Sequence, residues 1–197
     1  MAPRHGSRAA VRPARPDDVA AVRRIGVDAG RRFAEIPDPR VARCADDPPF
    51  EADELLPAIA EGCLWVAVHP ARTGGDEPVG FLLAVLLDGS LHVEELAVAP
   101  AHERAGHGGR LLEAADGAAW SLGRPALTLT TFADVPWNRP YYERRGFRVL
   151  DEVDLDDELR RIREDEAGHG LDPATRVVMA RPTRGRDDDS TPSGASS

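Results

Sequence analysis

Apolar and polar positions alternate along the chain in short runs that predict a β-sheet. Residues 64–69 and 79–87 are apolar and β-compatible, and the polar segment 72–76 between them predicts a turn that makes them an antiparallel pair. An Asp-Gly turn at residues 88–89 predicts a third consecutive strand over residues 91–99. The other predicted strands are residues 11–14, 126–132, 147–150 and 175–181.

Helical periodicity fills most of the sequence between these strands. Asp17 is expected to cap a first helix, because apolar residues recur from Val19 to Val27 at spacings that suit one helix face. The stretch from Glu35 to Phe50 is broken by prolines and predicts an irregular loop. The other predicted helices are residues 51–61, 110–122, 140–145 and 156–167.

The order of these elements predicts an α/β (α+β) fold in which helices flank one mixed, mostly antiparallel, twisted sheet of about seven strands. A length of 197 residues suits one domain. Residues 1–9 and 183–197 are rich in Gly, Ser, Pro and charge and contain almost no apolar side chains, so we expect disordered ends around a domain that covers residues 10–182.

Composition narrows the classes of partner. The formal net charge is −9, and all 25 basic residues are Arg because the chain contains no Lys, so we expect no nucleic-acid partner. No apolar run approaches the ~20 residues that a membrane-spanning helix needs, so no membrane partner is expected either. The two cysteines, Cys44 and Cys63, show no pairing or metal-binding pattern, which favours a reducing, cytoplasmic location.

A glycine-rich turn joins a predicted strand to a predicted helix at residues 103–109. Gly106, Gly108 and Gly109 leave backbone N–H groups accessible at the positive end of the helix dipole, and such a site binds phosphate. An ordinary strand-to-helix turn is the alternative interpretation of the same glycines. The absence of Lys excludes a P-loop, and the segment lacks the last glycine of a dinucleotide-binding fingerprint.

Two segments resemble the motifs of the GNAT acyl-CoA-dependent N-acetyltransferases. Residues 95–100, followed by residues 103–108, are similar to the family's motif A, Gln/Arg-x-x-Gly-x-Gly/Ala, although Glu103 stands where Gln or Arg is usual. Residues 138–147 resemble motif B, an Asn followed by Tyr-Glu-x-x-Gly-Phe. The resemblance extends from residue 11 to about residue 181 and implies a GNAT-like fold.

The resemblance implies a reaction in which acetyl-CoA and a primary amine of a small molecule or peptide bind together, and the amine attacks the thioester directly. A base must deprotonate the amine, and Glu94 and Glu95 are the candidates. Adjacent strand residues face opposite ways, and a β-bulge would exchange their faces. Glu95 is favoured because an acid immediately before Leu96 better matches the family, and a chain of water molecules is the alternative base.

Motif B implies that Tyr142 is the general acid that protonates the leaving thiolate, whereas Tyr141 packs. The alternative is that both tyrosines only pack a short helix. A backbone N–H near Leu96 or Ala97 is expected to polarise the thioester carbonyl.

The resemblance also implies that the strands around 91–99 and 126–132 splay apart to admit the coenzyme arm. The expected coenzyme-binding residues are Leu96, Ala97, Val98, Glu103, Arg104, Ala105, Gly106, His107, Gly108, Gly109, Arg110, Asn138 and Tyr141. The expected acceptor-binding residues are Phe33, Ile36, Trp65 and Trp137.

Acetyl-CoA, or another acyl-CoA, is therefore the expected co-substrate. No metal is expected, because His102 and His107 lack a third ligand at suitable spacing. The alternative function, from another class, is a catalytically silent acyl-CoA-binding sensor or partner module with the same fold. The sequence leaves open the acceptor, the acyl chain and whether the protein forms a homodimer.

Overall fold

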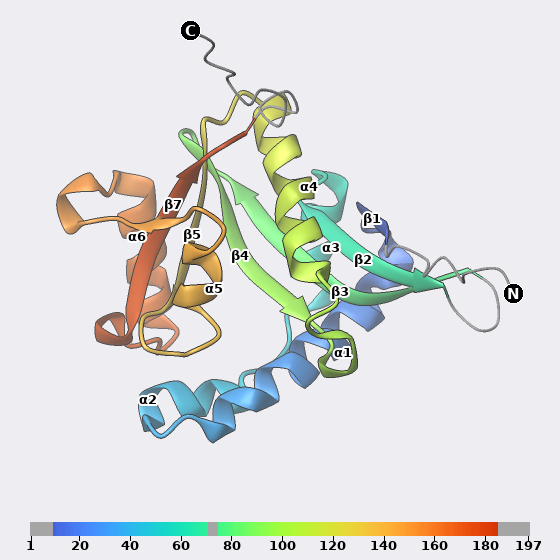
Figure 1. The fold of residues 1–197 in the computed structure, drawn as a ribbon, viewed down its shortest axis with the longest axis horizontal. Coiled ribbons are helices and arrows are strands. Elements are labelled where there is room, and N and C mark those ends of the chain that lie inside the picture. The colour runs from blue at the N-terminus through green and yellow to red at the C-terminus, as the bar shows by residue number, and fades with distance from the viewer. Residues whose placement is uncertain (1–9, 71–74, 185–197) are drawn as a thin grey trace, which may run out of the picture.

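The computed structural model describes residues 10–70 and 75–184, which form a seven-stranded sheet flanked by helices (Figure 1). The strands lie in the order β1-β2-β3-β4-β5-β7-β6. Every neighbouring pair is antiparallel except β4 and β5, which are parallel. The strand bounds are β1 Ala10–Pro13, β2 Leu64–Pro70, β3 Asp76–Leu86, β4 Ser90–Val98, β5 Ala126–Phe132, β6 Arg148–Val149 and β7 Arg176–Pro182. The predicted mixed sheet is confirmed.

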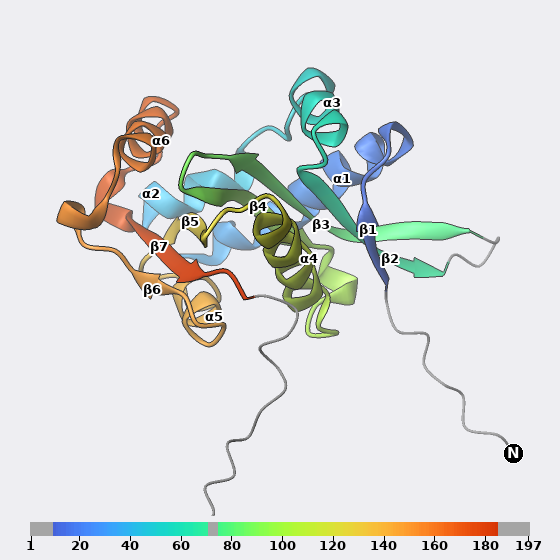
Figure 2. The same ribbon diagram turned by 90° about the horizontal axis from the view of Figure 1, so that it is seen from above.

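Helices cover both faces of the sheet (Figure 2). The helix bounds are α1 Val19–Gly30, α2 Pro39–Ala42, α3 Ala52–Ala60, α4 His107–Ser121, α5 Arg139–Glu143 and α6 Asp157–Gly168. Leu111 and Ala115 of α4 pack into a core cluster on one face, and Ile25 of α1 and Leu55 of α3 pack into a second cluster on the other. In the described part of the chain, no helix is both long and apolar enough to cross a bilayer.

The parallel strands β4 and β5 pair along only part of their length. Their register runs from Ser90 opposite Ala126 to Val93 opposite Leu129. Beyond these pairs β4 continues on β3 alone, and β5 continues on β7 alone, so the two strands diverge (Figure 1). The predicted splay of the sheet is therefore present.

A β-bulge in β4 determines which face each of its side chains occupies. Leu83 lies opposite Glu95 and Ala84 lies opposite Val93, which leaves Glu94 as the extra residue. Val93 packs in the cluster that contains α4, whereas Ala97 packs in the cluster that contains α1. The bulge thus moves Glu95 to the α1 side of the sheet.

The structure corrects the first-helix cap and the predicted loop that follows. Asp18, not Asp17, holds the first turn, because its carboxylate accepts a 2.7 Å hydrogen bond from the Arg15 N–H and pairs with Arg12. The segment predicted as an irregular loop, residues 35–50, contains α2 and a 3₁₀ turn at Arg43–Asp46. Asp38 accepts from the Arg40 N–H and so starts α2 despite the surrounding prolines.

Other boundaries also differ from the prediction by a few residues, and some predictions cannot be compared. Helix α4 begins at His107 rather than Arg110, and β6 covers two residues. The predicted turn at 72–76 lies mostly outside the described residues, as do the predicted disordered ends, except for residues 183–184.

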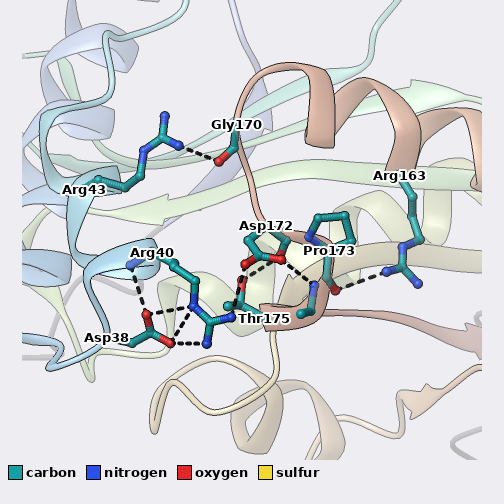
Figure 3. A network of polar contacts seen from close by, with 9 residues as sticks. Asp38, Arg40, Arg43, Arg163, Gly170, Asp172, Pro173 and Thr175 are labelled. Carbon is teal, nitrogen blue, oxygen red and sulfur yellow. Dashed lines mark hydrogen bonds and ion pairs between the residues drawn. The ribbon is translucent and has the colours of Figure 1, made fainter.

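Arginine side chains join α2 and the 3₁₀ turn after it to the loop between α6 and β7 (Figure 3). Arg40 contacts Asp38 on its own segment and Asp172 on the other, at 3.1 Å. Arg43 donates a 2.5 Å hydrogen bond to the Gly170 carbonyl. These contacts connect segments that are far apart in the sequence.

Two glycines allow the local packing to be tested. Gly170 has φ +87°, and a Cβ there would lie 2.6 Å from Nη1 of Arg43, whereas a Cβ on Gly117 in α4 would meet nothing within 4 Å. Gly170→Ala should therefore lower the free energy of unfolding by at least ~1 kcal/mol, because an L side chain is strained in left-handed backbone. Gly117→Ala should raise it by about 0.5–1 kcal/mol, because alanine suits a helix interior. Urea unfolding measures both, and shifts of the same sign would contradict this packing.

Candidate active site

The divergence of β4 and β5 opens a cleft with a volume of about 820 Å³. Its walls come from both strands, from α1 and the turn after it, from the start of α4 and from α5. The cleft therefore brings together the residues of both sequence motifs.

One end of the cleft is the backbone at the start of α4. Arg104 has φ +60° and Gly106 has φ +83°, and these two left-handed residues turn the chain from β4 into the helix. The first N–H groups of an α-helix have no partner within the helix. Since Gly106, His107 and Gly108 line the cleft, this end has the donor set that binds phosphate.

Gly108 is also the point where α4 meets α5. A Cβ at this position would overlap the hydroxyl oxygen of Tyr141 and lie 3.4 Å from its Cζ. The Tyr141 hydroxyl is buried and has no hydrogen-bond partner among the described residues, and burial raises its pKa. The guanidinium of Arg145 lies over the same ring, 3.5 Å from its centre. Glycine is thus needed here for packing between helices as well as for access to the backbone.

Two neighbouring carboxylates lie on β4 with different surroundings. Glu95 is half-buried against α1, where its Oε1 lies 3.5 Å from the position of a Cβ on Gly26. Loss of hydration, followed by the charge of Glu94, raises the pKa of Glu95 to about 7. Glu94 is exposed at the mouth of the cleft, and partial loss of hydration raises its pKa, with the charges of Glu54 and Glu166 adding to the shift. A pKa of about 7 places the ionisation of Glu95 near neutral pH.

The two tyrosines of motif B play different structural roles. Their rings meet edge to face, with centroids 5.2 Å apart, and Tyr142 also contacts the ring of Phe147. Burial raises the pKa of Tyr142 well above its usual range, and the charges of Tyr141 and Glu95 raise it further. Tyr142 therefore holds its proton at neutral pH in the same cleft as Glu95.

Most of the predicted coenzyme-binding residues line the cleft, and two do not. Ala105 and Arg110 are absent from its walls, although Nη2 of Arg110 lies 4.0 Å from the position of a Cβ on Gly106. Asn138 lines the cleft and makes no capping hydrogen bond to α5. The Asn138 side chain therefore does not cap this helix.

Of the four residues predicted to bind the acceptor, two aromatic residues line the cleft and two residues lie outside it. Phe33 and Trp137 line the cleft, and their ring centroids lie 6.2 Å apart. Ile36 packs behind this wall in the cluster that contains Phe132. Trp65 is only 6% exposed and packs in the α4-side core, because β2 is buried on both faces and shows no alternation that marks which face is which.

The sequence analysis missed several residues that line the same cleft. Arg176 of β7 contacts Glu166 of α6 at 2.6 Å and donates a 2.8 Å hydrogen bond to Thr130 of β5. Thr130 in turn donates to Glu166. No local sequence pattern marks these residues. They lie on three different elements, β7, α6 and β5, and only the fold brings them together. Within residues 10–70 and 75–184, no three His, Cys, Asp or Glu side chains are placed to hold a metal ion.

A seven-stranded mixed sheet that parts between its parallel strands beside an open helix N-terminus defines a GNAT-like fold. Residues 60–149 match the model of the acetyltransferase (GNAT) domain.

Solved acetyltransferases share the fold at low sequence identity. PaiA N-acetyltransferase from Thermoplasma acidophilum, solved with coenzyme A, is 14% identical with a TM-score of 0.64, and the match covers 88% of this chain and 98% of that one. N-acetylglutamate synthase from Neisseria gonorrhoeae, solved with coenzyme A and N-acetyl-glutamate, is 16% identical with a TM-score of 0.64, over 89% of this chain and 35% of that one. The ribosomal-protein-S18-alanine N-acetyltransferase from Escherichia coli is 15% identical with a TM-score of 0.57, over 92% and 98% of the two chains.

The contact between Gly108 and Tyr141 predicts a rescue. Gly108→Ala should lower the free energy of unfolding by about 1–3 kcal/mol, because the new methyl group overlaps the phenolic oxygen. Tyr141→Phe removes that oxygen, so the double variant should recover at least ~1 kcal/mol of the loss. Thermal or urea unfolding of the four proteins measures this coupling.

Gly109→Ala is the matched control, since its Cβ would lie at an ordinary 3.6 Å from Nη2 of Arg145. If the costs of Gly108→Ala and Tyr141→Phe simply add, the two residues are not in the contact described.

Proposed function

We propose that the protein is an acetyl-CoA-dependent N-acetyltransferase that acetylates a primary amine of a small molecule or peptide by direct attack in a ternary complex. The observation that carries this proposal is the placement of Glu95, with its pKa raised to about 7, in the same cleft as the open N-terminus of α4. The coenzyme would supply the acetyl thioester. The chain would supply the anion site, the base and the proton donor.

The charges along the cleft support an anionic donor at one end and a cationic acceptor at the other. Arg104 and Arg144 line the cleft and form no ion pair within the described residues, and Arg104 lies just before the positive end of α4. Glu94 and Glu95 likewise form no ion pair there. A diphosphate and an ammonium group would each meet opposite charge in this arrangement.

The coenzyme site would use backbone more than side chains. The N–H groups of residues 106–109 would hold the diphosphate, which needs close approach to the helix terminus. Beyond Val93, β4 has no strand neighbour on the β5 side, so alternate backbone groups of residues 94–98 can pair with an extended ligand. One of these N–H groups, at Leu96 or Ala97, would polarise the thioester carbonyl.

Glu95 and Tyr142 would handle the protons. A carboxylate with a pKa near 7 is well suited to accept a proton from an ammonium group at neutral pH. Tyr142, whose raised pKa keeps it protonated, would donate to the leaving thiolate sulfur. The bulge at Glu94 supports this division, because it turns Glu95 toward the α1 side while Leu96 remains packed on the α4 side.

The base assignment predicts a pH profile. kcat/KM should rise with pH and level off above about pH 7, because Glu95 acts in its deprotonated form and its pKa is about 7. Glu95→Gln should lower kcat/KM by about 10² or more and remove this inflection. Measuring the native protein and Glu95→Gln with the same acceptor amine separates the ionisation of Glu95 from that of the amine.

Glu94→Gln is the comparison that decides between the two carboxylates. A larger loss in this variant than in Glu95→Gln would reverse the assignment. Glu95→Gln should also raise the free energy of unfolding at pH 8, since a group whose pKa is higher in the folded protein than in the unfolded chain destabilises the fold once it is ionised.

The acid assignment predicts a split between turnover and binding. Tyr142→Phe should lower kcat by about tenfold or more, because a developing thiolate loses its proton donor, and should leave the Kd for coenzyme A within about twofold. Tyr141→Phe is the matched control and should change kcat by less than the Tyr142 variant. A greater effect on Kd than on kcat would reject this role for Tyr142.

Glu103 favours a second candidate, a silent acyl-CoA-binding module, because a carboxylate replaces the usual Gln or Arg of the phosphate loop. Release of free thiol from acetyl-CoA, measured with a panel of mono- and polyamines and peptide N-termini, distinguishes the two. Coenzyme-dependent thermal stabilisation without turnover of any amine or acyl chain would support the silent module.

A further inference from the structure

Arg32 contacts both walls of the cleft. It lies in the 3₁₀ turn Arg31–Glu35 directly after α1, and its Nη1 is 2.8 Å from Oε1 of Glu103, in the loop before α4. Its guanidinium carbon lies 4.1 Å from the ring centre of Trp137, in the loop after β5. All three residues line the cleft. One side chain thus connects the loops that follow the two diverging strands.

Glu103 brings an electrostatic difficulty to this loop. A carboxylate beside the start of α4 would repel the diphosphate proposed to bind there, and it also takes the place of a neutral or basic residue. Arg32 is the cation that pairs with it, and both side chains are about one-third exposed, which limits screening by water. The planar guanidinium suits this position, because it hydrogen-bonds a carboxylate while stacking on an aromatic ring.

We infer that Arg32 is a charge-compensating and positioning residue of the coenzyme site, which makes the loop at Glu103 compatible with an anionic ligand. This inference rests on the proposed coenzyme site. Arg32 does not touch the reacting groups Glu95 and Tyr142. Its role is to cancel the charge of Glu103 and to hold that carboxylate on the α1 side of the cleft.

A charge-compensating role differs in a measurable way from a purely structural one. If Arg32 acts by cancelling the Glu103 charge, then its removal matters only while that charge is present. If Arg32 instead supports the loop structurally, or contacts the coenzyme directly, then its removal weakens coenzyme binding equally whether position 103 is Glu or Gln. A double-mutant cycle separates these cases.

The test is calorimetric titration of coenzyme A into the native protein, Arg32→Ala, Glu103→Gln and the double variant. Arg32→Ala should weaken binding about five- to tenfold, as expected for one uncompensated charge near an anion. Glu103→Gln should bind as tightly as the native protein or more tightly. The double variant should bind within about twofold of Glu103→Gln.

Ionic strength distinguishes the two roles, because a purely structural role of Arg32 would not make the loss of coenzyme affinity depend on salt. The loss in Arg32→Ala should shrink between about 0.01 M and about 1 M ionic strength, because the Debye length falls from ~30 Å to ~3 Å. Arg31→Ala is the matched control, since Arg31 is the exposed neighbour that pairs with Asp28 at 3.0 Å. It removes the same charge from the same turn and should leave the Kd unchanged.

Each other outcome overturns the inference. An equal loss from Arg32→Ala in both backgrounds, or no loss at all while the native protein binds, would refute charge compensation and leave the proposed function intact. No binding of coenzyme A by the native protein would refute the proposed function, and this inference with it. If Arg32→Ala does not fold, Arg32→Gln removes the charge while keeping a hydrogen-bond donor and should show the same rescue by Glu103→Gln.

Discussion

The parting of two parallel strands is the constraint on which the rest of this molecule depends. Unpaired backbone groups inside a fold are costly unless water or a ligand satisfies them. Here each strand is held on its outer side, β4 by β3 as far as Val98 and β5 by β7 along its whole length. The sheet therefore stays intact while the inner edges remain open. The cleft is a property of the sheet, and the helices around it only complete its walls.

The extra residue Glu94 in β4 determines which side chains of this strand face the cleft. Without the bulge at Glu94, Glu95 would share a face with Val93 and point into the apolar core beneath α4. With the bulge it lies beside α1, where its Oε1 is 3.5 Å from the position of a Cβ on Gly26. Partial burial then raises its pKa without enclosing it in hydrocarbon. Backbone irregularity and base strength are thus two consequences of the same insertion.

The sequence predicted the helices and strands more accurately than the contacts between them. Residues 126–132 form the strand that their β-branched pattern indicates, because local propensity and burial agree there. The predicted start of α4 is too late. Gly108 and Gly109 favour a turn in the sequence, but in the structure they lie in the first turn of the helix. Trp65 lies in the core outside the cleft, and the sequence does not indicate this because a strand buried on both faces carries no alternation. The contact of Gly108 with Tyr141 joins two motifs, and neither motif alone contains it.

The pKa of Glu95 also depends on which acceptors pair with the arginines that line the cleft. Arg176 pairs with Glu166 and Thr130, and Arg32 pairs with Glu103, so both cations are held by other acceptors. A free guanidinium beside Glu95 would lower the pKa of that carboxyl and weaken it as a base. The influences that act on Glu95 are instead loss of hydration and the charge of Glu94, and both raise its pKa. These two ion pairs therefore matter less for stability, where such pairs contribute little, than for engaging Arg32 and Arg176 with acceptors other than Glu95, the carboxylate that we propose as the base.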